Sequence, residues 1–301
     1  MSFRWFGADD KVTLKHIRQI PGINDVVATL PDIPVGEVWP PSAIEARQEE
    51  VAAAGLRFSV VESVPVHEDI KLGRPTRDRL VDDYCQTLTH LGNAGIAVVC
   101  YNFMPIFDWM RTEVAMPMPD GATTMAYTDD VVKRTDLAQG VPALAAWVTG
   151  YDGATLAPLI AAYRALTAER MWENFAFFIE RIAPAAASVG VKLGLHPDDP
   201  PWPIFDVPRI ITDGAALERV IALSDSPANG ITFCTGSLGA SPENDLPAMI
   251  RRLGSRVHFA HCRNVRVTGE RTFYESAHPS RFGDVDMRDV MRALRDVGFT
   301  G

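Results

Sequence analysis

Short apolar runs alternate along this chain with longer amphipathic segments, and this alternation constrains the fold more than any other feature. Seven runs are expected to be strands: 3–6, 25–30, 57–62, 96–101, 191–196, 230–234 and 256–262. Helix-length segments lie between them, among them 42–54, 76–93, 156–189, 215–223, 244–253 and 287–296. Strands that alternate with helices in this way are typical of a parallel sheet covered by helices.

This order predicts an α/β protein built as a TIM (β/α)8 barrel. One domain is expected over residues 1–301, because α/β barrels of this length fold as one unit. The eighth strand is expected to be missing from the chain as given, since Gly301 stands where that strand should begin. The proline- and methionine-containing stretch at about 102–152 lacks the alternation and is predicted to be a long loop or lid.

The distribution of charge and cysteine excludes several classes of protein. The formal net charge is -9 and no cluster of Lys and Arg is present, which argues against nucleic-acid binding. No uncharged apolar stretch is long enough for a membrane span, and the N-terminus does not resemble a signal peptide. The 4 cysteines form no CxxC pair, so we expect a cytoplasmic protein with free thiols.

Three successive predicted strands end in side chains that bind metals. His196, Cys234 and His261 each stand at the end of an apolar run. The carboxyl ends of barrel strands meet at one rim, where active sites lie. A single histidine or cysteine at a strand end is often only a packed core residue. Three coincident strand ends favour a site for a divalent metal, which imidazole and thiolate both bind.

A carboxylate ligand is expected from the segment Gly283-Asp284-Val285-Asp286, directly before the last predicted helix. Asp284 and Asp286 point to the same side of an extended segment, so one of them suffices, and both are also candidates for catalysis. The alternative is that they cap the helix. His278 lies shortly before this pair and is a candidate acid or base.

Polar residues after the strand ends are candidates for substrate binding. Arg111 could pair with a carboxylate through two hydrogen bonds. Ser237 lies in a glycine-containing turn after Cys234, where backbone N–H groups could approach an anion. The full set of candidates is Tyr101, Asn102, Arg111, Asp198, Ser237, Arg263 and Asn264.

Taken together, these segments resemble the mannonate dehydratases over the whole chain. The resemblance is carried by segments 3–7, 16–22, 33–39 and 61–71, by Tyr101-Asn102, by His196-Pro197-Asp198-Asp199-Pro200-Pro201, by Cys234-Thr235-Gly236-Ser237 and by Gly283-Asp284-Val285-Asp286-Met287. It implies a TIM barrel of the xylose-isomerase-like group. It also implies a lyase of glucuronate (hexuronate) catabolism that dehydrates D-mannonate to 2-dehydro-3-deoxy-D-gluconate and water.

The resemblance further implies Mn²⁺ or Fe²⁺ as the cofactor. His196, Cys234, His261 and an aspartate are the implied ligands, with Asp286 favoured over Asp284. A thiolate ligand favours these metals over Mg²⁺. The expected partners are D-mannonate and further copies of the chain in a homo-oligomer, a dimer, with no nucleic acid and no membrane.

The chain departs from the family pattern at its end. Family members continue past the position of Gly301 with a strand that begins with a tyrosine implicated in catalysis and carries an Arg-Pro-Asp-His segment. Two alternatives to the dehydratase therefore remain. One is a metal-dependent sugar isomerase or epimerase on the same barrel, and the other is a truncated metal-binding remnant without turnover.

Overall fold

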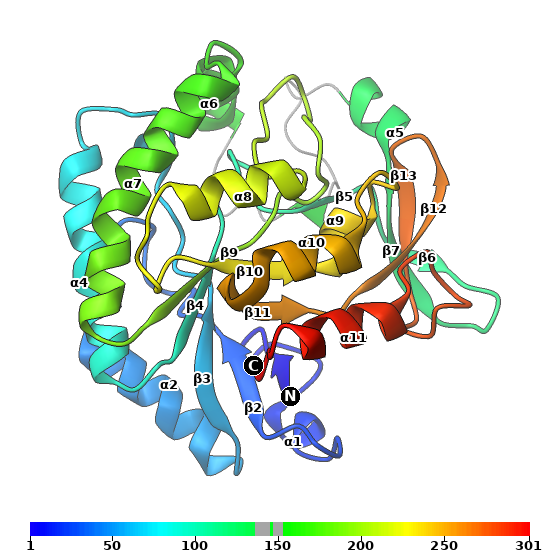
Figure 1. Cartoon of the computed structure of the whole chain (residues 1–301), viewed down its shortest axis with the longest axis horizontal. Helices are drawn as coiled ribbons and strands as arrows, with labels where there is room; N and C mark the ends of the chain where they lie inside the picture. Colours follow the sequence, from blue (N-terminus) through cyan, green and yellow to red (C-terminus); the bar gives the residue numbers. More distant parts are fainter. Residues whose placement is uncertain (136–144, 147–152) are drawn as a thin grey trace.

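The computed structural model describes residues 1–135, 145–146 and 153–301. Its centre is a parallel sheet of seven strands, which confirms the seven predicted strands (Figure 1). In spatial order they are β1 (Ser2–Arg4), β2 (Asp25–Ala28), β3 (Arg57–Glu62), β4 (Val98–Tyr101), β9 (Lys192–Leu195), β10 (Ile231–Cys234) and β11 (Val257–His261). Each strand lies beside the one that precedes it in this order, as in a (β/α) barrel.

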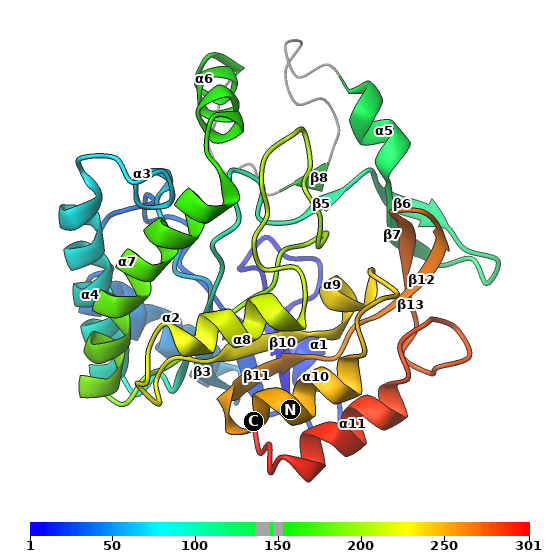
Figure 2. The same ribbon diagram turned by 45° about the horizontal axis from the view of Figure 1, so that its top comes forward.

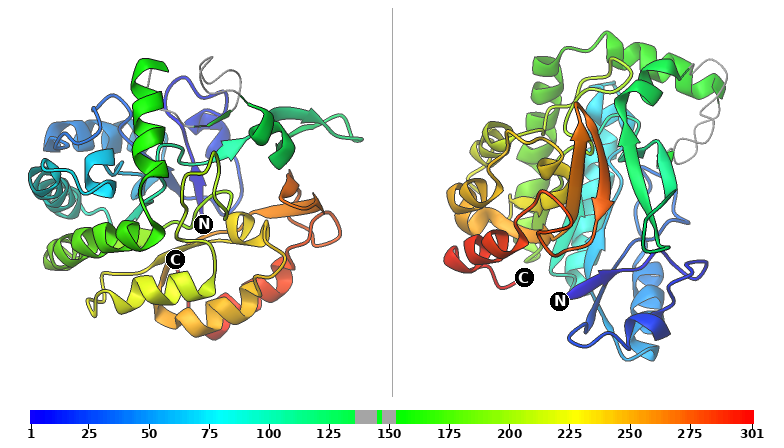
Figure 3. Two further views of the ribbon diagram at one scale, coloured as in Figure 1. Left: turned by 90° about the horizontal axis from the view of Figure 1, so that it is seen from above. Right: turned by 90° about the vertical axis from the view of Figure 1, so that its right-hand side faces the viewer.

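The sheet is open between β11 and β1 in the part of the chain that the structure describes. The architecture is therefore a seven-stranded parallel half-barrel, and no eighth strand is found among the described residues. The two ends of the chain lie side by side in every view (Figures 1, 2 and 3).

Helices cover the outer face of the sheet (Figure 1). They are α2 (Pro41–Ala53), α4 (Arg77–Asn93), α7 (Ala168–Ser188), α8 (Gly214–Ala222), α10 (Leu246–Leu253) and α11 (Met287–Asp296). The short helices α1 (Leu14–Ile17), α3 (Glu68–Lys71), α9 (Thr235–Gly239) and the 3-10 turn η2 (Gly254–Arg256) lie in the connections between these elements. The helix predicted over 156–189 is two helices, α6 (Gly153–Arg164) and α7. The second helix begins where the Thr167 hydroxyl accepts a hydrogen bond from the Arg170 N–H.

Alternation along each strand divides its side chains between the outer helical layer and the inside of the half-barrel. On β4, Tyr101 is fully buried and packs edge-on against Phe178 of α7, at 6.0 Å between ring centroids. Cys100 points the other way, into a small inner cluster with Val60 and Phe259. Neighbouring residues at the end of this strand therefore pack in two different places, one against the outer helices and one in the inner cluster.

The stretch predicted as a loop or lid contains regular structure. Its strands β5 (Met110–Arg111), β6 (Glu113–Pro117) and β7 (Thr123–Thr128) are followed by helix α5 (Asp129–Arg134). β6 and β7 join β13 (Thr272–Ser276) and β12 (Asn264–Gly269) in an antiparallel sheet beside α9, and β5 pairs with β8 (Ala145–Ala146) (Figure 2). Residues 136–144 and 147–152 of the predicted lid lie outside the described residues.

None of the helices in the described part of the chain is long and apolar enough to cross a membrane.

Candidate active site

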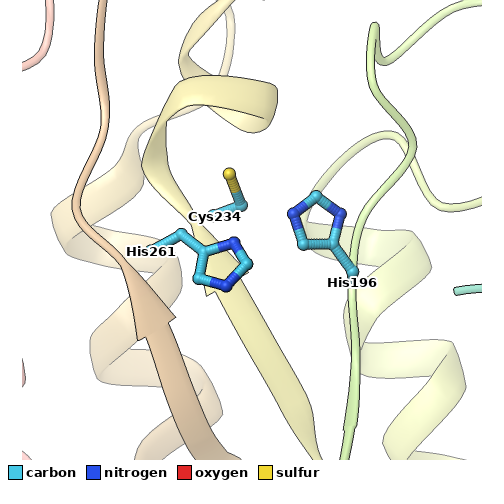
Figure 4. A group of neighbouring side chains, drawn as sticks. All are labelled: His196, Cys234 and His261. Atoms are coloured by element: carbon cyan, nitrogen blue, oxygen red, sulfur yellow. The ribbon is translucent and has the colours of Figure 1, made fainter. Parts of the chain in front are cut away.

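The three predicted metal-binding side chains lie together at the carboxyl end of the sheet (Figure 4). Cys234 and His261 are directly paired in the parallel register of β10 and β11, and His196 follows β9 on the other side of β10. Their ligand atoms all lie within 4.8 Å of one another. The adjacency of three parallel strands therefore gathers two imidazoles and one sulfur from 66 residues of sequence (196 to 261).

The His196 ring is held by its own backbone. Its Nδ1 lies 2.7 Å from the Pro197 carbonyl oxygen, which can only accept a hydrogen bond. Nδ1 therefore donates this hydrogen bond, and Nε2 is the ring nitrogen left for a metal. A hydrogen bond from the ring nitrogen that does not bind the metal is the usual means of orienting a metal-binding histidine.

The Cys234 sulfur is buried among hydrogen-bond donors. It accepts from the Ser237 N–H at 3.4 Å and from the Ser237 hydroxyl at 3.2 Å. Burial by itself would raise the pKa of Cys234, but Arg263 and His196 outweigh it and hold this pKa well below the usual range of a thiol. A thiolate beside two imidazoles fits a divalent transition metal.

Glu62 stands at the end of β3, and its side chain lies beside His261 of this group. Its Oε2 lies 3.3 Å from His261 Nε2 and 4.0 Å from Arg4 Nε. Burial would raise the pKa of Glu62, but His261 and Arg4 lower it below the ordinary value. Burial opposes the charge on His261 as well, yet Glu62 and Cys234 raise the pKa of His261 to about 10. The carboxylate beside the trio is thus Glu62, which sequence analysis did not select although it also ends a strand.

A cavity of about 440 Å³ opens over this cluster. Its charged and polar lining comprises Arg4, Thr29, Glu62, Ser63, Glu68, Lys71, Tyr101, Asn102, Asp108, Arg111, His196, Asp199, His261, Arg263 and Glu275. This volume is of the size that binds a small molecule. Charged groups of both signs around it suit a polar ligand better than an apolar one.

Arg111 lines the cavity but its donors are all used. Nη1 donates to the Met110 carbonyl and to Asp199 Oδ1, both at 2.8 Å. Nη2 donates to Asp199 Oδ2 and to Glu275, and Nε donates to the same Glu275 oxygen. Its five N–H groups make five hydrogen bonds within the protein, so Arg111 has no donor left in this structure for the predicted contact with a substrate carboxylate.

Arg263 is placed differently. Its Nη2 donates to Asp199 Oδ2 at 2.7 Å, and its buried Nε lies 3.7 Å from Glu275 Oε1 without a hydrogen bond among the described residues. The side chain is 28% exposed and lines the cavity. Gly236 makes this position possible, because a Cβ there would lie 2.0 Å from Arg263 Nε. Arg263 therefore differs from the fully buried Arg111 in being partly exposed to the cavity.

Asp199 holds the two arginines together. It is 1% exposed and pairs with both Arg111 and Arg263. Burial would raise the pKa of Asp199, but the two guanidinium groups hold it well below its usual range. The proline-rich segment supplied this residue, although sequence analysis chose its neighbour Asp198.

Three of the predicted substrate-binding residues, Asp198, Ser237 and Asn264, do not line the cavity. Asp198 is buried and accepts from the Ile211 N–H, and Ser237 contacts Cys234 and Asp199. Asn264 donates to the carbonyls of residues 277 and 278 and accepts from the N–H of residue 285. Tyr101 and Asn102 both line the cavity, and the Tyr101 ring also packs against Phe178 of α7.

The aspartates predicted as the carboxylate ligand lie away from the trio. Asp286 caps α11, where Oδ1 accepts from the Arg288 and Asp289 N–H groups. Asp284 pairs with Arg266 at 2.6 Å and is 38% exposed. In this structure the helix-capping alternative is the one that describes Asp286. His278 is also exposed, and its Nε2 donates to the Cys262 carbonyl.

Lys71, Glu68 and Asp108 were missed by sequence analysis. Lys71 is 3% exposed and donates to Glu68 at 2.9 Å and to the Met104 carbonyl at 2.6 Å. Asp108 lies near Lys71, and burial raises its pKa. These residues come from loops and a short helix after β3 and β4, and their sequence carries no periodic signal that separates them from ordinary surface charges.

The whole chain, residues 1–301, matches the family model described as D-mannonate dehydratase (UxuA). It is 49% identical over 303 residues to mannonate dehydratase 2 of Halalkalibacterium halodurans, a match that covers 100% of this chain and 88% of that protein. It is 50% identical over 315 residues to the mannonate dehydratase of Thermotoga petrophila, with 99% of this chain and 86% of that protein covered.

Comparison of the fold with solved structures leads to the same family. The crystal structure of mannonate dehydratase from Streptococcus suis serotype2 superposes with a TM-score of 0.91 at 42% identity, covering 100% of this chain and 83% of that one. The D-psicose 3-epimerase of Clostridium cellulolyticum H10 superposes with a TM-score of 0.56 at 14% identity, over 99% of this chain and 78% of that one. The second match shows a shared fold alone. The match to the family model over the whole chain and the identity to these relatives show that the chain belongs to the D-mannonate dehydratase family.

Proposed function

We propose that this protein dehydrates D-mannonate to 2-dehydro-3-deoxy-D-gluconate and water with Mn²⁺ or Fe²⁺ as its cofactor. The observation that carries the proposal is the trio of His196, Cys234 and His261 at the edge of a charged cavity. Family membership supplies the substrate, because the relatives at 49% and 50% identity are named mannonate dehydratases.

The proposed ligands are His196 Nε2, the Cys234 sulfur and His261. Catalytic metal sites commonly use three protein ligands and keep a position open for substrate or water, as zinc enzymes show. When bound, a divalent metal supplies Lewis-acid stabilisation of the negative charge that develops as C2 of the sugar acid loses its proton. In this proposal Glu62 orients His261 through its Nε2 contact, and Asp284 and Asp286 are not ligands.

The remaining residues of the cavity bind and orient the sugar acid. Arg263 is proposed to receive the carboxylate, since it lines the cavity and its side chain is 28% exposed. Asn102 and Lys71 offer donors to the hydroxyl groups of the substrate. Asp284, Asp286 and His278 lie outside the cavity lining, and the proposal gives them no role in proton transfer.

The resemblance also leads us to propose a place in glucuronate catabolism, a cytoplasmic location and assembly into a homo-oligomer.

Activity can be tested directly. The purified chain, stripped of metal and then given Mn²⁺ or Fe²⁺, should convert D-mannonate to a 2-keto-3-deoxy acid, detected by nuclear magnetic resonance. The metal-free protein should form none. A product that keeps every hydroxyl would indicate an isomerase or epimerase instead, and binding of D-mannonate without turnover would indicate a remnant.

The ligand set is tested by metal analysis of Cys234→Ser. We expect its Mn²⁺ affinity to fall by at least about 100-fold, since even loss of a residue that only supports a ligand costs 10–100-fold. Cys262→Ser is the matched control, because Cys262 adjoins His261 in sequence but is not part of the trio. Full metal occupancy in Cys234→Ser would show that the sulfur is not a ligand.

A further inference from the structure

The sulfur of Cys234 has a hydrogen-bonding environment that metal binding alone does not require. We propose that Ser237 is a positioning residue for this sulfur, and that Asp199 and Arg263 keep its hydroxyl directed at the sulfur. This inference rests on the proposed function, because it takes Cys234 to be a metal ligand.

Local structure places the first donor. Cys234 occupies the N-cap of α9, and its sulfur accepts the Ser237 N–H at 3.4 Å in the manner of a capping side chain. This contact comes from the backbone and would survive any substitution at residue 237 that keeps the turn. It fixes the sulfur at the end of β10, where the His196 and His261 side chains also hydrogen-bond to it.

The second donor is the Ser237 hydroxyl, 3.2 Å from the sulfur. The same oxygen also lies 3.1 Å from Asp199 Oδ2 and 3.4 Å from Arg263 Nη2. A serine hydroxyl has a single proton, so Asp199 and Cys234 compete for it, whereas Arg263 can only donate to the oxygen.

The neighbouring arginines decide this competition. Asp199 Oδ2 already accepts from Arg263 Nη2 at 2.7 Å and from Arg111 Nη2 at 3.2 Å. Both of its favourable acceptor positions are therefore used by charged donors, which form stronger hydrogen bonds than a hydroxyl does. The Ser237 proton is left for the sulfur, and Arg263 completes the arrangement by donating to Ser237 Oγ.

The consequence lies in the electronic character of the thiolate. Two hydrogen bonds from Ser237 stabilise its negative charge and lower the energy of its lone pairs. Groups around a metal that hydrogen-bond its ligands tune affinity by 10–100-fold. The Ser237 hydroxyl is fully buried and does not line the cavity, so it acts on the metal through Cys234 and not on the substrate.

Cobalt substitution gives a readout that a merely structural role would not move. Co²⁺ bound to a thiolate has a sulfur-to-cobalt charge-transfer absorption in the near ultraviolet. We expect this band to move to longer wavelength in Ser237→Ala, because the lone pairs rise in energy when the hydroxyl is lost. We also expect the Co²⁺ affinity of this variant to fall by about tenfold or more.

Ser276→Ala is the matched control. Its hydroxyl is also buried, and among the described residues it has no hydrogen-bond partner. It should leave the band and the affinity as in the parent protein. Ser237→Thr retains a hydroxyl and should restore the parent band, which keeps the test open if the alanine variant does not fold.

A charge-transfer band at the parent wavelength in folded Ser237→Ala would overturn the inference, as would an alanine-like shift in folded Ser237→Thr. Failure of the proposed function looks different. If the parent protein binds Co²⁺ without any thiolate band, Cys234 is not a ligand, and the inference falls together with the ligand set.

Discussion

Two pairs of aspartates in this chain look alike in sequence, but one pair is buried in the structure and the other lies at the surface. Asp198 and Asp199 follow β9 and are each 1% exposed. Asp284 and Asp286 precede α11 and lie at the surface, where one pairs with Arg266 and the other caps the helix. Both pairs stand beside proline or glycine in a turn, so neither composition nor local context separates them.

The difference is where each turn lies relative to the parallel sheet. The first turn leaves the carboxyl end of a central strand, and the Met110 N–H donates to the Asp199 carbonyl from β5. It is enclosed by the segments after β4 and β11. The second turn leads from the small antiparallel sheet into an outer helix, where water can reach it. A carboxylate in the buried first turn needs cationic partners, whereas a carboxylate in the exposed second turn does not.

The largest effect is expected from Asp199→Asn. This change removes the negative charge that the buried Arg111 and the partly exposed Arg263 share. Breaking a buried ion pair costs about 3–5 kcal/mol of unfolding free energy. Chemical denaturation of the metal-free protein measures it. A loss below about 1 kcal/mol would place Asp199 with the surface aspartates and remove the contrast.

His196→Ala tests the same turn for metal binding. We expect Mn²⁺ affinity to fall by at least about 100-fold, because the trio loses one imidazole. Isothermal titration with Mn²⁺ gives the value. His278→Ala is the control, since this exposed ring donates only to the Cys262 carbonyl. Equal losses in the two variants would contradict the proposed ligand set.

Asp286→Ala should show a smaller effect of another kind. Loss of a helix N-cap costs about 0.5–2 kcal/mol, and the carboxylate accepts two backbone N–H groups of α11. Thermal unfolding should report this loss while metal stoichiometry stays unchanged. Loss of the metal instead would restore Asp286 as the carboxylate ligand that the sequence predicted.

The smallest effect is expected from Asp284→Asn. Its ion pair with Arg266 is partly exposed, and such pairs contribute at most about 1 kcal/mol. The change matches Asp199→Asn chemically, so the difference in unfolding free energy between the two variants isolates burial. A cost as large as that of Asp199→Asn would mean that the surface turn is as critical as the buried one.

The sequence by itself determined the parallel sheet and three members of the site. Apolar periodicity located all seven strands, and the rule that active sites lie at the carboxyl ends of strands selected His196, Cys234 and His261. Both are local signals that need only the order of the elements. The same rule applied to β3 points to Glu62.

Tertiary structure alone decided which charges meet. Arg111 and Glu275 are 164 residues apart and lie 2.7 Å from each other, because β5 and β13 are carried to the same edge of the cavity. The strands within the predicted lid were missed for a similar reason, since β7 becomes a strand by pairing with β13, far along the chain. Hydrogen bonds and ion pairs between distant segments depend on which surfaces pack together, and no local pattern records that choice.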